Sequence, residues 1–496
     1  MYDPLTYRVD VSPDATALID PARNAQLTFA NLDTEVERTA GRLAALGVHP
    51  GDRLGILLPT RPAVEVVHAA IRLGAAVVPL GTRLAPPELA DRMERAEVTT
   101  LVCGGETETD AVAAVDATNG DSSIPIASVD DPTDERVAAL SARTPEAVVP
   151  HDWECESTLF VPFTSGTTGK PKGVRLTFRN MLSSAVASAF RLGLDRAATW
   201  HVALPIHHVG GLSPIFRMPL YGMTVVCRDS FDTEAVADDF DTYDVTATSL
   251  VPTTLSRLLD ATTGSLGASL RTVLLGGAPA TESLLDRCRE RDVPVFPTYG
   301  MTETASQIAT ATPEEATAHP GTVGRPLFWT TLSVRDDEGD ELPPGEVGEL
   351  VVAGPTVSPG YLDGANEPFG PNGLRTGDVG YRDADGRVWV IGRTDDLIVT
   401  GGENVAPAEV EDALLAHSGV ADAAVVGLPD EEWGERVAAL VVPREGADLS
   451  TADLDDHCAE HLAGYKCPRT VAFADVIPRT DSGTIRRSAV RELLRD

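Results

Sequence analysis

The sequence predicts an α/β protein: a large N-terminal domain of doubly wound α/β sheets with a β-rich module, then a small α+β C-terminal domain. Short apolar strands alternate with amphipathic helices along the N-terminal part, which is typical of parallel sheets. From about residue 335 short strands are joined by Gly, Pro and Asp turns. After Arg393 a compact tail alternates helices and strands again.

Apolar runs and their stop signals locate the N-terminal elements. Residues 54–59 (LGILLP) form a short strand, and a helix begins near Pro62, because proline fits the first turn of a helix. Its apolar residues recur at helical spacing, and Gly74 ends it. Further strands are expected at 75–80 and 99–104 with a polar helix at 87–96 between them, and at TVVCR, TATSLVP and RTVLLGG (271–277).

The tail after Arg393 is expected to fold as a small domain of its own. Its elements are a helix at 407–416, strands at 421–428 and 436–443, a helix at 451–463 and a strand at 471–477. The Ala-, Asp- and Thr-rich segment 105–150 is expected to be a variable surface region. The predicted domains are therefore 1–392 and 393–496, with the β-rich module at about 335–392.

The charge of the chain restricts its partners. The 496 residues carry a formal net charge of −35, which disfavours nucleic acid and anionic membranes because both would repel the protein. Lysine occurs only at 170, 172 and 466, against 37 arginines. An acidic chain with so little lysine resembles proteins of salt-loving archaea, whose carboxylates keep the surface hydrated. An acidic protein from a GC-rich genome is the alternative.

Cysteines and termini indicate the compartment. The six cysteines form no CxxC pair and no Cys/His cluster at zinc spacing. The first ten residues lack the basic and apolar regions of a signal peptide, and no run approaches the ~20 apolar residues of a membrane span. We therefore expect a cytoplasmic protein with reduced thiols. The sequence leaves the oligomeric state open, and a homo-oligomer is one option.

The stretch FTSGTTGKPKG, residues 163–173, has the composition of a phosphate-binding loop. Glycines let backbone N–H groups converge on an anion, hydroxyls add donors, and Lys170 adds a compact charge. It is not the common P-loop, because only two residues separate Gly166 from Gly169 and Pro171 follows the lysine. A flexible surface loop is the alternative, but the flanks LFVPF and VRLTF look like strands that hold it.

Five further motifs follow in order: LGGAPA (275–280), PTYGMTETASQ (297–307), RTGDVG (375–380), GRTDDLIVTGGENVAPAEVE (392–411) and PRTDSGTIRR (478–487). With the loop, they resemble the adenylate-forming superfamily of acyl-CoA synthetases, luciferases and peptide adenylation domains. The resemblance spans nearly the whole chain. Within it, YGMTETASQIAT and TGGENVAPAE resemble the o-succinylbenzoate–CoA ligases of menaquinone biosynthesis.

The resemblance implies an enzyme, an AMP-forming acid–thiol ligase that uses ATP, Mg²⁺ and CoA. A carboxylate attacks the α-phosphate of ATP, which gives an acyl-adenylate and pyrophosphate; the CoA thiol then displaces AMP. A carboxylate is a poor electrophile, whereas its adenylate carries a good leaving group. The charge that develops at phosphorus calls for Mg²⁺, backbone donors and a cation.

The resemblance also assigns residues to ATP. The β- and γ-phosphates would be held by Thr164, Ser165, Gly166, Thr167, Thr168, Gly169 and Lys170. The adenine pocket would be formed by Gly276, Gly277, Ala278 and Pro279, with Tyr299 stacked on the ring. The α-phosphate would meet Thr302, Mg²⁺ would bind Glu303, and the ribose would bind Asp378 and Arg393. Each assignment has a structural alternative. Residues 276–279 could be a plain strand-to-helix turn and Tyr299 a core aromatic. Thr302 and Glu303 could simply begin a helix, and Asp378 could lie in an ordinary turn.

The remaining implied residues concern domain motion and the acid. Asp395 matches the hinge about which a mobile C-terminal domain swings, and Gly402 would line the tunnel for the CoA arm. His208, in IHHVGGLS (206–213), matches a histidine of the acyl pocket, or is structural. Arg217 could pair with the free aromatic carboxylate of o-succinylbenzoate, or lie on a helix surface. Residues Gly300 and Ser306 would shape the same pocket.

One position departs from the pattern. The last motif of the family ends in Gly-Lys, and that lysine bridges the carboxylate and the α-phosphate during adenylation. This chain has Gly483 and Thr484 there. We expect Arg486 or Arg487 to supply the charge; otherwise adenylation is slow, or only the second half-reaction takes place. Lys466 matches a different position of the family and is no obvious substitute.

The resemblance therefore implies an ATP-dependent acid–CoA ligase that acts on o-succinylbenzoate. Another aryl- or fatty-acyl-CoA ligase is the nearest alternative, since it would share the chemistry. A catalytically impaired nucleotide-binding protein is an alternative of another class, suggested by Thr484. An adenylation domain that loads a carrier protein is a further option, but no carrier domain follows on this chain.

Overall fold

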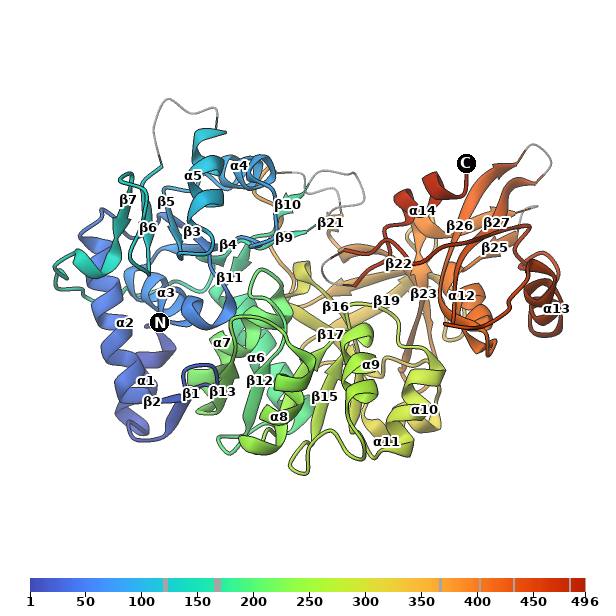
Figure 1. The fold of residues 1–496 in the computed structure, drawn as a ribbon, viewed down its shortest axis with the longest axis horizontal. Helices are drawn as coiled ribbons and strands as arrows, with labels where there is room; N and C mark the ends of the chain where they lie inside the picture. The colour runs from blue at the N-terminus through green and yellow to red at the C-terminus, as the bar shows by residue number, and fades with distance from the viewer. Residues whose placement is uncertain are drawn as a thin grey trace.

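A computed structural model describes residues 1–118, 124–164, 171–364, 368–400, 403–430, 433–480 and 483–495, and only the backbone of Asn404. The N-terminal part occupies the left and centre of Figure 1 and the C-terminal part the right. Among the described residues no helix is both long and apolar enough to cross a membrane.

The first sheet has seven strands in the order β11-β8-β4-β3-β5-β6-β7, paired in parallel except for β11 with β8. Its strands are β3 (Arg53–Leu57), β4 (Ala76–Pro79), β5 (Thr100–Cys103), β6 (Ile126–Ser128), β7 (Val137–Ala139), β8 (Thr158–Phe160) and β11 (Leu176–Thr177). The helices of this region are α1 (Pro4–Val11), α2 (Phe29–Ala44), α3 (Thr60–Leu73), α4 (Pro86–Arg95), α5 (Glu108–Asp116) and the short η1 (Leu140–Ala142).

The second sheet has nine strands in the order β18-β17-β16-β15-β14-β12-β13-β1-β2 and a parallel centre. Its strands are β1 (Thr16–Asp20), β2 (Ala25–Thr28), β12 (Thr199–Val202), β13 (Thr224–Cys227), β14 (Ala247–Leu250), β15 (Thr272–Leu275), β16 (Val295–Met301), β17 (Ser306–Thr310) and β18 (Arg325–Pro326). The helices are α6 (Phe178–Leu192), α7 (Val209–Tyr221), α8 (Thr233–Thr242), α9 (Pro252–Ala261), α10 (Glu282–Glu290), η2 (Thr302–Thr304) and α11 (Pro313–Ala318).

The β-rich module is an antiparallel sheet in the order β19-β20-β22-β21, with β23 on β22. Its strands are β19 (Thr331–Arg335), β20 (Gly348–Ala353), β21 (Phe369–Gly370), β22 (Gly373–Arg382) and β23 (Val388–Arg393). It thus begins a few residues before the expected position.

The C-terminal part has its own core. Its sheet has the order β25-β24-β27-β26, with β28 on β27. The elements are η3 (Thr394–Asp396), β24 (Ile398–Thr400), β25 (Glu403–Val405), α12 (Pro407–Ala416), β26 (Val420–Asp430), β27 (Gly434–Pro443), α13 (Thr451–His461), β28 (Thr470–Phe473) and α14 (Arg487–Leu493). Two hydrophobic clusters contain only residues between Ile398 and Leu494, so this part buries its apolar residues against itself.

Most predicted elements are confirmed, and one expectation is wrong. The helix that begins near Pro62 is α3, and Gly74 caps it in the left-handed conformation at φ 83°. The segment 105–150 is more than a surface region, because α5, β6 and β7 lie within it and both strands extend the first sheet. Apolar residues of this segment, such as Ile126 and Val137, are buried in its core.

Candidate active site

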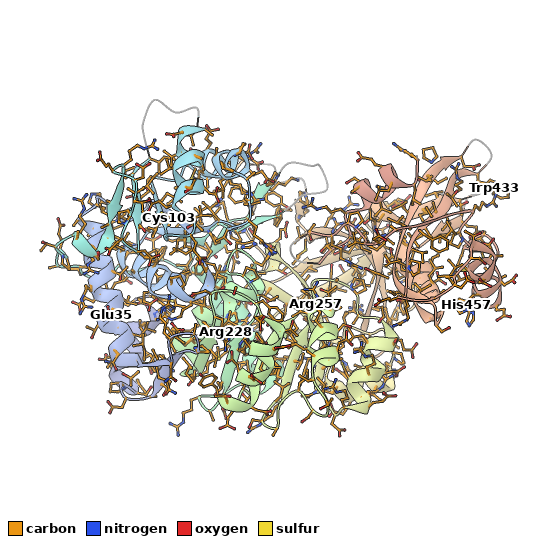
Figure 2. All side chains as sticks on the ribbon, in the orientation of Figure 1. Glu35, Cys103, Arg228, Arg257, Trp433 and His457 are labelled. Carbon is orange, nitrogen blue, oxygen red and sulfur yellow. The ribbon has the colours of Figure 1, made fainter. Side chains whose placement is uncertain are left out.

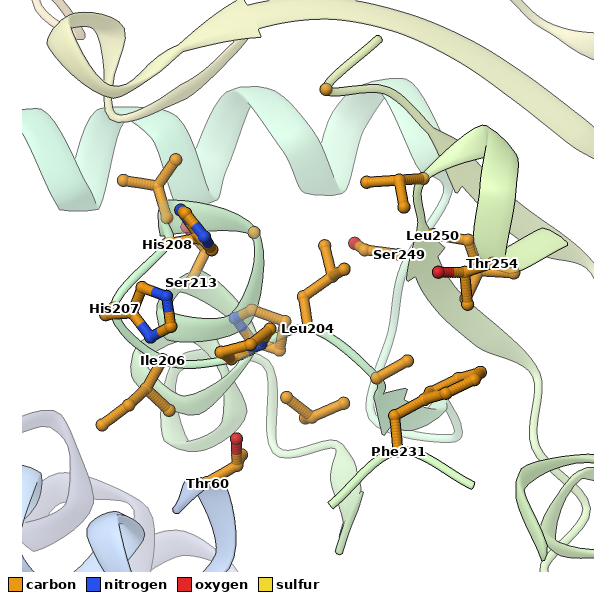
Figure 3. A pocket seen from close by; sticks show the side chains of 18 of the residues that line it. Thr60, Leu204, Ile206, His207, His208, Ser213, Phe231, Ser249, Leu250 and Thr254 are labelled. Carbon is orange, nitrogen blue, oxygen red and sulfur yellow. The ribbon is translucent and has the colours of Figure 1, made fainter. Parts of the chain in front are cut away.

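A cavity of about 880 Å³ lies along the carboxyl ends of the second sheet. Its wall includes residues that follow β12, β14 and β15, the start of η2, and Arg479, Thr480 and Gly483 from the C-terminal part. Figure 3 shows His207 and His208 on one side of the cavity, with Ser249, Leu250 and Thr254 on the other. Ligands of α/β proteins bind in the crevice at this edge of the sheet.

The predicted phosphate loop is held at both ends by strands. A two-stranded antiparallel ribbon pairs β9 (Phe163–Thr164) with β10 (Lys172–Gly173), and Thr164 lies opposite Lys172. The expectation that flanking strands hold the loop is thus confirmed. Ser165, Gly166, Thr167, Thr168, Gly169 and Lys170 lie outside the described residues, as does Gly402.

The predicted adenine pocket is partly at the cavity. Gly276 and Gly277 follow β15 and line the wall, whereas Ala278 and Pro279 are not among the lining residues. A Cβ on Gly276 would lie 2.7 Å from the methyl carbon of Thr298, and Gly277 has φ 80°. Both positions therefore need glycine, the first for space and the second for its backbone conformation.

A partly buried network joins Tyr299, Asp378 and Arg393. The Tyr299 hydroxyl donates to one oxygen of Asp378 at 2.5 Å, and Arg393 pairs with the other at 3.0 Å. Asp378 and Arg393 face each other in the ladder between β22 and β23. Burial raises the pKa of Asp378, and it raises the pKa of Tyr299 well above 10 with help from the Asp378 charge. The network fixes the Asp378 carboxylate in one orientation, with a lone pair of each oxygen left to accept from a hydroxyl.

Thr302 and Glu303 begin η2 beside this network. Thr302 lines the cavity, and Glu303 is 5% exposed with one carboxylate oxygen accepting from the Tyr361 hydroxyl at 2.8 Å. Burial raises the pKa of Glu303. Among the described residues no group of three or more His, Cys, Asp or Glu could hold a metal. A single carboxylate still fits Mg²⁺, which proteins commonly bind through one or two carboxylates plus substrate phosphates.

The residues predicted to form the acyl pocket all line the cavity. His208 precedes α7 and lies 4.3 Å from His207, ring centre to ring centre, and both line the wall with Gly300 and Ser306. Burial lowers the pKa of His207 to about 3, so this ring is neutral. A Cβ on Gly300 would lie 1.9 Å from the Ser306 carbonyl oxygen, which excludes any side chain there.

Arg217 is buried, so the alternative of a helix-surface arginine is wrong. It lies on α7, is 3% exposed, and donates to the hydroxyls of Ser188 at 3.0 Å and Ser184 at 2.9 Å. Its Nε has no hydrogen-bond partner and no carboxylate among the described residues pairs with it, although the residue lines the cavity. Burial lowers its pKa. An arginine within an apolar helix was the sequence signal that Arg217 is buried. Its partners Ser184 and Ser188 were not predicted.

The C-terminal loop reaches the cavity without bringing Arg486 there. The Thr484 hydroxyl donates to the Gly277 carbonyl at 3.5 Å. Arg486 is exposed at the start of α14 and does not line the cavity. Arg487 is bound inside the C-terminal part, 2.6 Å from Glu411 and 3.4 Å from Asp396. Asp395, the predicted hinge, lies exposed in η3.

Two family models cover most of the chain. The AMP-binding enzyme model matches residues 5–362, and the AMP-binding enzyme C-terminal domain model matches residues 409–484. The chain belongs to the AMP-binding enzyme family.

Individual relatives match over almost their full length. The chain is 40% identical to 2-succinylbenzoate–CoA ligase of Bacillus licheniformis, over 97% of this chain and 98% of the relative. It is 36% identical to the Listeria monocytogenes enzyme of the same name, over 98% of each chain. The structure of o-succinylbenzoate CoA synthetase from Bacillus subtilis in complex with the acyl-adenylate intermediate aligns with a TM-score of 0.90 at 37% identity, over 99% of this chain and 98% of that one.

The same Bacillus subtilis enzyme also aligns less well in another state. A double mutant bound with a product analogue gives a TM-score of 0.74, with the identity again 37% and the coverage again 99% and 98%. Sequence similarity therefore does not account for the difference. The structure of this chain as a whole is more similar to the acyl-adenylate complex.

Proposed function

We propose that the chain is an ATP-dependent ligase that converts o-succinylbenzoate and CoA to o-succinylbenzoyl-CoA through an acyl-adenylate. The observation that carries the proposal is Arg217, a buried guanidinium that lines the cavity and, among the described residues, donates only to two serine hydroxyls. A buried charge without a counter-charge costs several kcal/mol, so the site favours a ligand that supplies a carboxylate.

o-Succinylbenzoate has two carboxylates, and the two have different roles. The succinyl carboxylate attacks the α-phosphate of ATP, while the aromatic carboxylate pairs with Arg217 and holds the ring. Benzoate and fatty acids have one carboxylate each, which the reaction consumes. Either acid would leave the buried charge of Arg217 without a carboxylate. A buried polar group left unpaired discriminates between substrates more strongly than a missing apolar contact does. This favours the dicarboxylate over the substrates of other acyl-CoA ligases.

The proposed nucleotide roles follow from the partly buried network of Tyr299, Asp378 and Arg393. The Asp378 carboxylate, held by Tyr299 and Arg393, accepts from the ribose hydroxyls, and Thr302 donates to the α-phosphate. Glu303 would hold Mg²⁺, which when bound offsets the negative charge of the phosphates. Thr164 to Lys170 bind the β- and γ-phosphates, which leave as pyrophosphate when the adenylate forms. Tyr299 stacks on adenine beside Gly276 and Gly277.

Thioester formation requires a change of domain arrangement at Asp395. Domains 1–392 and 393–496 rotate about this residue after adenylation, so that Gly402 enters the tunnel for the CoA arm. The two TM-scores against the Bacillus subtilis complexes, 0.90 and 0.74, support two arrangements. Motions of this kind gate many enzymes.

The net charge of the chain supports a function in concentrated salt. The proposed compartment is the cytoplasm. At a net charge of −35 with three lysines, the surface repels itself at low ionic strength. A homo-oligomer remains a prediction.

AMP release tests the proposed function. Mg-ATP and CoA are supplied in high-salt buffer with o-succinylbenzoate, benzoate or octanoate, and turnover is expected with o-succinylbenzoate alone. A preference for benzoate or octanoate would overturn the proposed substrate and leave the proposed ligase reaction intact. No turnover with any acid would favour an impaired nucleotide-binding protein.

A further inference from the structure

Adenylate formation brings two anions together at one point, the substrate carboxylate and the α-phosphate. A cation at that point lowers their repulsion and stabilises the charge that develops at phosphorus. In this chain the C-terminal loop delivers Thr484 to the adenylate site, where its hydroxyl contacts Gly277. A hydroxyl carries no charge, so Thr484 itself supplies no cation there.

Five arginines line the cavity in the described part of the chain: Arg83, Arg217, Arg228, Arg257 and Arg479. Three of them have clear partners. Arg217 is bound to Ser184 and Ser188, Arg228 pairs with Asp239 at 2.6 Å, and Arg479 pairs with Asp422 at 2.7 Å. Arg83 also has an interaction, and its charge helps to lower the pKa of His207 on the acyl side.

Arg257 differs from the other four. No hydrogen bond, ion pair or ring contact involves its side chain in the part of the chain that the structure describes, and it is exposed. Figure 2 labels it near the boundary between the N-terminal and C-terminal parts. In a chain with 75 carboxylates and 40 basic residues, an unpaired cation on the cavity wall is available to a ligand.

The place of Arg257 on α9 directs its side chain toward the adenylate site. The start of α9 contacts both sides of that site: a Cβ built on Gly277 would lie 3.2 Å from Val251, and one built on Gly483 would lie 3.3 Å from the Thr253 hydroxyl. Arg257 follows Thr253 by four residues, one helical turn or about 6 Å along the axis. Side chains on a helix lean toward its N-terminus, which directs the Arg257 side chain toward the turn that carries Thr253, and both residues line the cavity.

We infer that Arg257 supplies the positive charge at the adenylate site that the resemblance to the family assigns to a lysine at the position of Thr484. The inference rests on the proposed adenylation chemistry, whichever acid is activated. Because α9 belongs to the N-terminal part, this charge stays at the site when the C-terminal part moves. Arg479 has a different role, since it donates to the Gly483 carbonyl at 2.9 Å and shapes the C-terminal loop.

The test compares Arg257→Ala, Arg257→Lys and the double variant Arg257→Ala/Thr484→Lys. The assay is acid-dependent exchange of pyrophosphate into ATP, with whichever acid the wild type activates. We expect Arg257→Ala to lower kcat about 100-fold with a smaller change in the KM for ATP, as for loss of a transition-state charge contact. Arg257→Lys should retain part of the activity. Thr484→Lys should restore at least tenfold to Arg257→Ala, which a purely structural role of Arg257 would not allow.

Arg196→Ala is the matched control, because Arg196 is also exposed and does not line the cavity. Arg486→Ala tests the competing arginine. An unchanged kcat in Arg257→Ala, or a loss in Arg486→Ala instead, would overturn the inference and leave the proposed function intact. A loss in Arg257→Ala that neither the lysine variant nor Thr484→Lys relieves would also overturn it. A wild-type chain that activates no acid would overturn both.

Discussion

Burial sets the chemistry of Glu303. Its side chain is 5% exposed, accepts from Tyr361 and has no cationic side chain within ion-pair distance in the described structure, and burial raises its pKa. The folded protein therefore keeps the Glu303 proton at pH values where the unfolded chain has released it. The stability that this group contributes is present below the ordinary pKa of glutamate and is lost as the pH rises through the raised pKa.

Glu303→Gln should separate activity from stability. Glutamine keeps an acceptor for Tyr361 but carries no charge for Mg²⁺, so we expect kcat/KM for Mg-ATP to fall about 100-fold or more. At pH 7.5 without metal, the Tm should stay equal to that of the wild type or rise, because glutamine carries no charge that burial disfavours. Kinetics and thermal unfolding measure the two. Exposed Glu314→Gln is the control, and a Tm well below the wild-type value would contradict the account.

Among single residues, the order of motifs along the chain predicted more of the candidate site than the local sequence pattern did. The order of motifs singled out Asp378 and Arg393, and the structure pairs them. Nothing local to residues 209–221 showed that Ser184 and Ser188 of α6 would enclose Arg217, since these residues are far apart in sequence. Arg257 was missed for the same reason, because Gly483, which lies beside Thr253 of the same helix, is more than 200 residues away in sequence.

At the scale of elements, two ion pairs bracket the proposed hinge. Arg393 is tied to Asp378 on the N-terminal side, and Asp396 to Arg487 on the C-terminal side at 3.4 Å. Arg487 is in turn held by Glu411 and the Val425 carbonyl, which fixes Asp396 to the C-terminal core. Only Thr394 and Asp395 lie between the two pairs, so rotation is concentrated there.

Asp395→Pro should therefore impair one half-reaction. Proline locks φ near −65°, within the range typical of 3-10 turns such as η3, whereas a second arrangement would have to change φ at this residue. We expect adenylate formation within about threefold of the wild type and thioester formation from supplied acyl-adenylate slowed about 100-fold. Single-turnover experiments measure both, with Asp395→Ala as control. Equal losses in both steps would be evidence against a hinge at this residue.

Elements were predicted well where apolar runs are long enough to show a period. Expected strand 54–59 is β3, and expected helices 87–96 and 407–416 are α4 and α12. The segment 105–150 failed because β6 and β7 are three residues each, too short for alternation to appear. Their place in the sheet comes from pairing, of β6 with β5 and of β7 with β6.

For the whole molecule, the net charge of −35 predicts a strong dependence of stability on salt. Screening shortens the range of repulsion from about 8 Å at 0.15 M to about 3 Å at 1 M ionic strength. We expect the Tm to rise by several degrees between 0.15 M and 2 M KCl. Betaine at equal osmolality is the control for effects other than screening. A Tm that is independent of KCl would contradict the proposed adaptation to brine.

The most direct measurement of the central claim compares o-succinylbenzoate with 4-oxo-4-phenylbutanoate, which lacks only the aromatic carboxylate. The account predicts a kcat/KM about 100-fold or more higher for o-succinylbenzoate in the wild type, because the analogue leaves Arg217 unpaired. In Arg217→Met the ratio should fall to about one, mainly through loss with o-succinylbenzoate. A ratio near one in the wild type, or a ratio unchanged in Arg217→Met, would contradict the account.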